Sequence, residues 1–174
     1  MISASRSPRM IRYADDLVIL CRPGEGGEMK ERLARWLQSR GLALNETKTR
    51  VLQSCASGFE FLGFSFRWQQ SKKGTPYVHT EPSPAAEQAL RDRVRKLTRR
   101  PTTWRATGEV VREINQVSRG WGNYHRSFRA MDDFIAHRLR QWLWRKHGSP
   151  WDKYQRWPTR LLHQTYGLHS LLTQ

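Results

Sequence analysis

The stretch Ile11-Arg12-Tyr13-Ala14-Asp15-Asp16-Leu17-Val18-Ile19-Leu20 places two adjacent carboxylates inside a mostly apolar run rich in β-branched residues. Such a run predicts a β-hairpin, with one strand over residues 10–14, a turn at the aspartates and a return strand over residues 17–21. Carboxylates are costly inside a sheet, whereas at the tip of a hairpin they can hold divalent cations. A solvated Asp-Asp turn is the plain alternative, which the flanking strands disfavour.

The overall composition indicates a folded protein whose partner is a polyanion. Hydrophobic side chains make up 37% of the 174 residues and include eight Trp, enough for one ordinary domain or two small ones. The chain has 31 Lys and Arg against 15 Asp and Glu, a formal net charge of +16. Arginine dominates the basic set and suits phosphate contacts, so nucleic acid is the expected partner rather than a membrane.

Hydropathy and cysteine usage favour a protein without membrane spans. The longest unbroken apolar stretch is residues 17–21, far too short for a transmembrane helix. Residues 1–10 have no apolar core of signal-peptide length. Cys21 and Cys55 do not have metal-ligand spacing. A cytoplasmic location with reduced thiols is therefore expected.

Charge is distributed unevenly along the chain. Residues 1–82 carry 13 basic and 8 acidic side chains, whereas residues 83–174 carry 18 basic and 7 acidic ones. The second half is therefore the stronger candidate for polyanion binding, while the first half holds the acidic pair.

The pattern after the hairpin predicts a small layer of strands and one helix up to about residue 80. A helix is expected over residues 28–40, with an apolar face formed by Met29, Leu33, Trp36 and Leu37. Residues 41–52 are expected to form a short strand, a turn at Asn45 and another strand. Residues 59–66 are dense in Phe and favour a second hairpin around Gly63.

From Ser83 onward the apolar spacing becomes helical. Ser83-Pro84 provides a cap and a first-turn proline for a helix that Pro101 is expected to end. Thr107 is expected to cap a second helix, and a third amphipathic helix is expected over residues 131–143. The predicted fold class is therefore α+β, with a partial antiparallel sheet and one packed helix followed by an all-α helical bundle.

Two motifs resemble those of a known family. The Tyr13-Ala14-Asp15-Asp16 tetrad between apolar strands resembles the palm block of bacterial group II intron reverse transcriptases. Asn115-Gln116-Val117-Ser118-Arg119-Gly120-Trp121-Gly122-Asn123-Tyr124-His125 resembles the block that marks their maturase-specific domain, also called thumb or domain X. The resemblance spans roughly residues 9–167. It implies that residues 1–80 are the C-terminal portion of a palm and residues 81–174 a maturase-specific domain.

For the palm, the resemblance implies a magnesium-dependent site for nucleotidyl transfer. Two Mg²⁺ ions about 3.5–4 Å apart serve such chemistry, and Asp15 would bind both, with Asp16 in support. Tyr13 would contact the primer or the backbone near its end; a core tyrosine on its strand is the plain alternative, and the two roles are compatible. Lys48 would lie near the leaving pyrophosphate, although an exposed turn lysine is the plain alternative. Gly63 would let the primer strand approach the backbone.

For the maturase-specific domain, the resemblance implies contacts with RNA. Arginine and aromatic side chains interleaved at a helix end can hold phosphates and stack on bases. The candidates of this kind are Arg119, Trp121, Asn123, Tyr124 and Arg126. Trp121 and Tyr124 are expected to be mainly structural, and the arginines to contact RNA. Arg95, Arg99 and Arg100, expected on the first helix of the bundle, are further phosphate-binding candidates.

A complete palm also needs a third carboxylate, which in this family lies upstream together with the fingers. No acidic residue precedes Asp15, so the magnesium site is expected to be incomplete. The first interpretation is the C-terminal part of a group II intron RNA-directed DNA polymerase and maturase. It would bind intron RNA and primer–template, and would need a separately encoded N-terminal fragment for polymerase activity. The alternative is a non-catalytic RNA-binding module from a degenerate intron reading frame.

Overall fold

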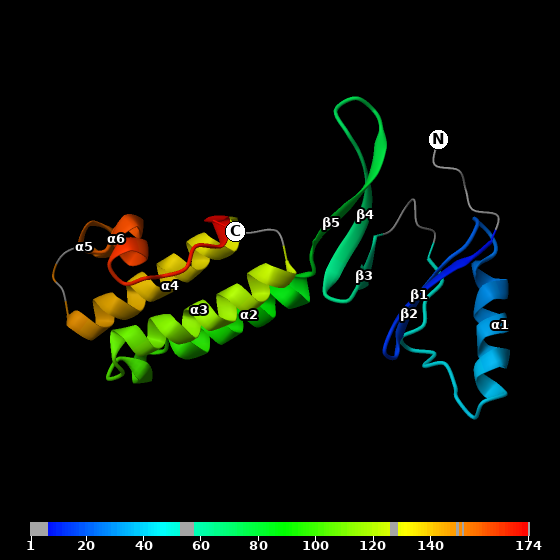
Figure 1. Cartoon of the computed structure of the whole chain (residues 1–174), viewed down its shortest axis with the longest axis horizontal. Helices are drawn as coiled ribbons and strands as arrows, with labels where there is room; N and C mark the ends of the chain where they lie inside the picture. The colour runs from blue at the N-terminus through cyan, green and yellow to red at the C-terminus, as the bar shows by residue number, and fades with distance from the viewer. Residues whose placement is uncertain (1–6, 53–57, 126–128, 149, 151, 174) are drawn as a thin grey trace. The chain divides into compact units, whose positions relative to one another are not determined.

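A computed structural model of the chain describes residues 7–52, 58–125, 129–148, 150 and 152–173 (Figure 1). The chain divides into two compact units, Met1–Thr80 (unit 1) and Glu81–Gln174 (unit 2). Two small antiparallel sheets and one helix make up unit 1, and helices make up most of unit 2. The predicted α+β class is confirmed. No helix among the described residues combines the length and apolarity needed to cross a bilayer.

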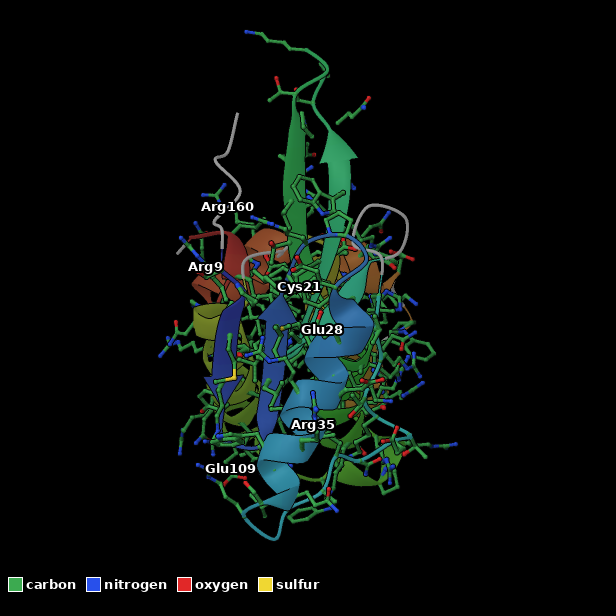
Figure 2. The ribbon with its side chains drawn as sticks, turned by 90° about the vertical axis from the view of Figure 1, so that its right-hand side faces the viewer. Arg9, Cys21, Glu28, Arg35, Glu109 and Arg160 are labelled. Carbon is green, nitrogen blue, oxygen red and sulfur yellow. The ribbon has the colours of Figure 1, made fainter. Side chains whose placement is uncertain are left out.

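The Asp-Asp segment forms the predicted hairpin. β1 (Arg9–Tyr13) pairs antiparallel with β2 (Asp16–Leu20), and Tyr13 lies opposite Asp16. Ala14 and Asp15 are therefore the two loop residues. Ala14 has a φ of 51°, the positive value that two-residue hairpin loops require at their first position. Arg9 and Cys21 lie at the open end of the hairpin (Figure 2).

α1 (Gly26–Gln38) is the helix predicted after the hairpin, although it begins and ends two residues earlier than expected. Its apolar side chains are at most half-buried. Trp36 is 51% exposed, and the guanidinium of Arg40 lies 3.9 Å from the centre of its ring. Glu28 lies in its first turn and Arg35 in its last turn, where their charges interact favourably with the helix dipole (Figure 2).

Residues 39–52 contain no strand, and the strands predicted within residues 41–52 are therefore wrong. The predicted turn at Asn45 is present, because its side-chain oxygen accepts from the Lys48 amide at 3.2 Å. This turn satisfies backbone donors locally, which strand pairing would otherwise use. Lys30 Nζ donates to a Glu46 carboxylate oxygen at 2.7 Å and ties the turn to α1.

β3 (Phe59–Phe61), β4 (Phe64–Gln70) and β5 (Pro76–Pro82) form a three-stranded sheet in that order. β3 and β4 are the predicted aromatic hairpin, in which the rings of Phe59 and Phe66 stack at 5.1 Å. Leu62 and Gly63 form its loop with φ values of 51° and 77°, as a type I′ turn requires. β5 was not predicted, because the prolines at both of its ends weaken the strand signal. As an edge strand, β5 can accommodate these prolines, which cannot donate to a neighbouring strand.

α2 (Pro84–Leu97) begins as predicted, with Ser83 Oγ accepting from the Ala86 amide at 3.2 Å. It ends at Leu97 rather than at Pro101, because a proline four residues on cannot donate to the Leu97 carbonyl and crowds it. Pro101 lies within a 3₁₀ turn, η1 (Arg100–Thr102). Arg99 and Arg100 therefore lie beyond the first helix of the bundle, contrary to the prediction.

α3 (Thr107–Tyr124) and α4 (Arg129–His147) pack with α2 as the predicted bundle (Figure 1). The prediction that Thr107 caps α3 is wrong. Thr107 is the first helical residue, and Ala106 occupies the cap position without a side-chain hydrogen bond. The spacing located this helix correctly, but the cap residue lies one position earlier.

The C-terminal segment completes the core of unit 2. α5 (Lys153–Arg156), α6 (Thr159–Gln164) and η2 (Leu171–Thr173) were not predicted. After α6 the chain runs back along α4 (Figure 1). This segment supplies four of the buried hydrophobic residues, namely Trp157, Leu162, Leu168 and Leu171. The described buried hydrophobic side chains all lie in unit 2.

Candidate functional site

The β1–β2 hairpin places its candidate residues at an exposed tip. Tyr13, Asp15 and Asp16 are all exposed, and 66% of Tyr13 is accessible. The alternative of a core tyrosine is therefore wrong. Arg12 Nε donates to the Ala14 carbonyl at 2.7 Å, which helps to hold the tip in its turn.

The carboxylates at this tip do not by themselves fit a two-metal magnesium site. Asp15 is a loop residue and Asp16 begins β2, so the tip offers two exposed carboxylates from consecutive positions. In the described part of the chain, no group of three or more His, Cys, Asp or Glu side chains could hold a metal ion. A two-metal centre clamps both ions between several carboxylates. A magnesium site here would need ligands beyond those described.

The other candidates of unit 1, Lys48 and Gly63, lie outside the β1–β2 hairpin. Lys48 is exposed in the turn that Asn45 organises. The presence of glycine at position 63 has a local structural explanation, because a φ of 77° favours glycine. Its proposed contact with a primer strand stays a prediction.

Several basic side chains of unit 2 stabilise the fold. Arg140 is 4% exposed, and its guanidinium donates to the Trp157 carbonyl at 2.7 Å and to Thr159 Oγ1 at 3.0 Å. Burial lowers the pKa of Arg140, yet a guanidinium stays charged. Arg105 forms an ion pair with Glu113, and this hydrogen bond lowers the pKa of the Glu113 carboxyl. These cations are committed to internal contacts.

A second set of basic side chains is exposed. Its members form no ion pair and no side-chain hydrogen bond with any residue that the structure describes. They are Arg93, Lys96, Arg99, Arg100, Arg112, Arg119, Arg129, Arg145 and Arg156. Three of the sequence-predicted candidates, Arg99, Arg100 and Arg119, fall in this set.

Arg95, although also a candidate, is partly committed. Its guanidinium donates to Asp92 at 2.7 Å and lies 5.5 Å from the centre of the Phe134 ring. Hydrogen bonds from Gln88 and from Arg95 lower the pKa of the Asp92 carboxyl. The neighbouring Asp92 offsets the charge of Arg95, so Arg95 is less available to a phosphate than Arg99 or Arg100.

The last turns of α3 carry Arg119, Trp121, Asn123 and Tyr124. The prediction that the aromatic residues here are structural holds for Trp121, which packs against the core and lies 4.7 Å from the His125 ring. Tyr124 is 53% exposed and its ring meets the His125 ring edge-on at 4.8 Å, so for Tyr124 the structural role stays a prediction. Burial lowers the pKa of His125. Arg126 lies outside the described residues.

The candidate RNA-binding residues of unit 2 lie in two separate regions. Arg99 and Arg100 precede α3, whereas Arg119 and Tyr124 lie in its last turns. α3 has 18 residues, so its ends are roughly 27 Å apart at about 1.5 Å per residue. A ligand that contacts both groups must extend along the bundle, as a nucleic acid can.

Residues 87–160 match the family model described as group II intron, maturase-specific domain. This part of the chain is similar to the maturase-specific domain of group II introns. The match contains α3, α4 and most of α2, and leaves unit 1 outside it. No curated protein and no solved structure shows significant similarity to the chain.

The structure also identifies residues that the sequence analysis did not select. Trp104, between α2 and α3, is 82% exposed. In the sequence, its position outside any helical apolar spacing could have indicated an exposed tryptophan. Asn115, read only as part of a motif, donates to the Gly167 carbonyl at 2.8 Å. That role had no sequence signal, because its partner is 52 residues away.

Proposed function

We propose that unit 2 binds the structured RNA of a group II intron, and that the chain acts as a maturase-type RNA-binding protein. The observation that carries this proposal is the set of exposed arginines without internal ion pairs, on a helical bundle that matches the maturase-specific family. A well-packed core holds the helices that carry these cations. Phosphate contacts of this kind position RNA without reading its sequence.

The salt dependence of binding tests this proposal. Each neutralised phosphate contributes about −0.7 (single strands) to −0.9 (duplex DNA) to the slope of log affinity against log salt. The double substitution Arg99→Ala with Arg100→Ala should therefore weaken binding and flatten the slope by roughly 1.4 to 1.8 units. Fluorescence anisotropy with a labelled intron RNA, over a series of KCl concentrations, measures both quantities.

A matched pair of arginines in unit 1 provides the control. Arg32 and Arg35 are exposed on α1, and replacing both with Ala removes the same charge. This control should leave the slope close to that of the unmodified chain, and Arg95→Ala should have a smaller effect than Arg99→Ala. Equal effects from the two double variants would mean that charge acts only diffusely. A slope near zero for the unmodified chain would contradict RNA binding.

We further propose a conditional role for the exposed Asp15 and Asp16, namely a contribution to polymerase activity together with a polypeptide that supplies a third palm carboxylate and fingers. The support is the position of both aspartates at an accessible hairpin tip. We expect no primer extension by residues 1–174 alone on a primed RNA template with Mg²⁺, because the residues that the structure describes include no group of three side chains able to hold a metal ion. Extension that appears after adding an N-terminal reverse-transcriptase fragment, and that Asp15→Asn abolishes, is the expected result. Extension by the chain alone, abolished by Asp15→Asn, would contradict this reasoning.

A further inference from the structure

The segment between α2 and α3, residues 98–106, exposes an aromatic side chain that the core does not use. Trp104 is 82% exposed, the largest fraction among the exposed large hydrophobic residues described. A single exposed hydrophobic residue is common and by itself indicates nothing. Two further observations set this one apart, namely the anchoring of its segment and the charge that precedes it in the chain.

Side chains of α4 hold the first part of this segment. Arg138 Nε donates to Thr98 Oγ1 at 3.1 Å, and the fully buried Trp142 donates through Nε1 to Thr102 Oγ1 at 2.9 Å. Arg138 and Trp142 are four residues apart, so both lie on one face of α4. The segment before Trp104 is therefore anchored at two side chains.

Lys146, one further turn along the same face of α4, anchors the backbone around Trp104 itself. Its ammonium donates to the Thr103 carbonyl at 2.8 Å and to the Arg105 carbonyl at 2.7 Å. These two carbonyls flank Trp104 in the chain. The segment thus presents the indole on a fixed backbone, which reduces the entropy that binding would otherwise cost.

Two free cations precede this indole in the same segment. Arg99 and Arg100 are exposed and form no ion pair with any described residue. An exposed aromatic ring four and five residues after two exposed arginines suits a nucleotide whose base is unstacked, because the ring can stack on the base while the cations bind adjacent phosphates. Bases inside a duplex have no free face for the indole.

We infer that residues 99–104 form a binding site for an unpaired nucleotide of RNA, in which Trp104 stacks on the base and Arg99 and Arg100 hold the flanking phosphates. The inference rests on the proposed RNA binding by unit 2 and specifies the kind of RNA that this segment takes. Trp104 supplies selectivity for unpaired RNA, and the two arginines supply affinity that depends on salt.

Binding of the full-length chain to two labelled RNAs tests this site. One is a stem-loop with an unpaired, adenosine-rich loop, and the other is a blunt duplex of similar length. Trp104→Ala should weaken binding to the stem-loop roughly 5- to 150-fold, the effect of losing one base–aromatic stack of about 1–3 kcal/mol. It should leave the salt slope unchanged, because the indole neutralises no phosphate. Binding to the duplex should be unaffected.

Two further variants distinguish stacking from loss of structure. Trp104→Phe keeps an aromatic ring and should retain most of the affinity for the stem-loop. Trp144→Ala removes a comparable indole, 44% exposed on α4, and should leave binding to both RNAs unchanged. Thermal unfolding followed by circular dichroism should give the same midpoint for Trp104→Ala as for the unmodified chain.

Several results would overturn the inference. Equal losses from Trp104→Ala and Trp144→Ala, or equal losses for stem-loop and duplex, would exclude a specific stacking site. Unchanged RNA binding together with loss of a protein partner in Trp104→Ala would assign the indole to a protein interface instead. If the unmodified chain binds RNA with a steep salt slope and Trp104→Ala does not weaken binding to the stem-loop, only this inference fails. If the unmodified chain binds neither RNA, the proposed function fails with it.

Discussion

At the scale of single residues, basic side chains on one helix serve different purposes according to their burial. Arg140 is buried on α4 and hydrogen-bonds to the segment that follows this helix, with its guanidinium 4.7 Å from the centre of the Tyr154 ring. Arg145, five positions on, is exposed and has no ion pair among the described residues. The first arginine therefore stabilises the fold, and the second is available to a ligand.

Replacing these two arginines should separate the roles. Arg140→Ala should lower the free energy of unfolding by about 2–4 kcal/mol, because it removes two charge-assisted hydrogen bonds and leaves the Trp157 carbonyl without this donor. Arg145→Ala should change it by less than about 0.5 kcal/mol. Urea denaturation followed by circular dichroism measures both values. Equal stabilities would show that water replaces the Arg140 contacts without cost.

At the scale of elements, two helices hold the C-terminal segment by side-chain contacts to its backbone. Asn115 on α3 donates to the Gly167 carbonyl and accepts from the His169 amide, both at 2.8 Å. Asp132 on α4 accepts from the Leu171 amide at 2.9 Å. These bonds keep the buried Leu168 and Leu171 against the bundle. The segment is thus part of the core.

Loss of the Asn115 contacts should loosen this segment before the rest of unit 2. Asn115→Ala removes two hydrogen bonds and should destabilise unit 2 by about 1–3 kcal/mol. Hydrogen exchange should speed up first at the amides of residues 167–171. Gln116→Ala, at an exposed position of the same helix, is the matched control and should change neither quantity. Uniformly faster exchange across all of unit 2 would mean that the segment does not open separately.

At the scale of the whole molecule, the two units differ in how well they bury their apolar side chains. Residues 90–171 supply the buried hydrophobic core, which includes the fully buried Trp142 and Ile114. Apolar residues of unit 1 remain exposed instead, among them Met10, Ile11 and Leu42, each more than 50% accessible. Hydrophobic burial is the main favourable term in folding, so unit 2 holds most of the intrinsic stability.

Separate expression of the two units should reveal this asymmetry. Residues 81–174 alone should unfold cooperatively in urea, with a sigmoidal transition. Residues 1–80 alone should give a shallow change or aggregate, because exposed apolar strands lack a core to cover them. Circular dichroism and analytical size-exclusion chromatography measure both outcomes. A cooperative transition for residues 1–80 would contradict the assignment of stability to unit 2.

Local patterns predicted much of the fold, because periodicity and turn chemistry act over neighbouring residues. The alternation around Asp15, the Ser83-Pro84 cap and the apolar spacing of α3 and α4 each placed an element correctly. The strands expected within residues 41–52 failed, because the side chain of Asn45 satisfies the backbone locally. α6 was missed because it is short, and its Leu162 is buried only through contacts with distant helices.

The sequence by itself determined which chemical groups the chain carries: an Asp-Asp hairpin, an excess of arginine and a segment similar to the maturase-specific domain of group II introns. Only the tertiary structure decided which of these groups are free to act. Arg95 is held by Asp92, Arg140 by the Trp157 carbonyl, and Trp104 is held out on a segment that α4 anchors. The physical reason is that burial and hydrogen bonding depend on partners brought together across the chain, and the order of residues alone does not specify them.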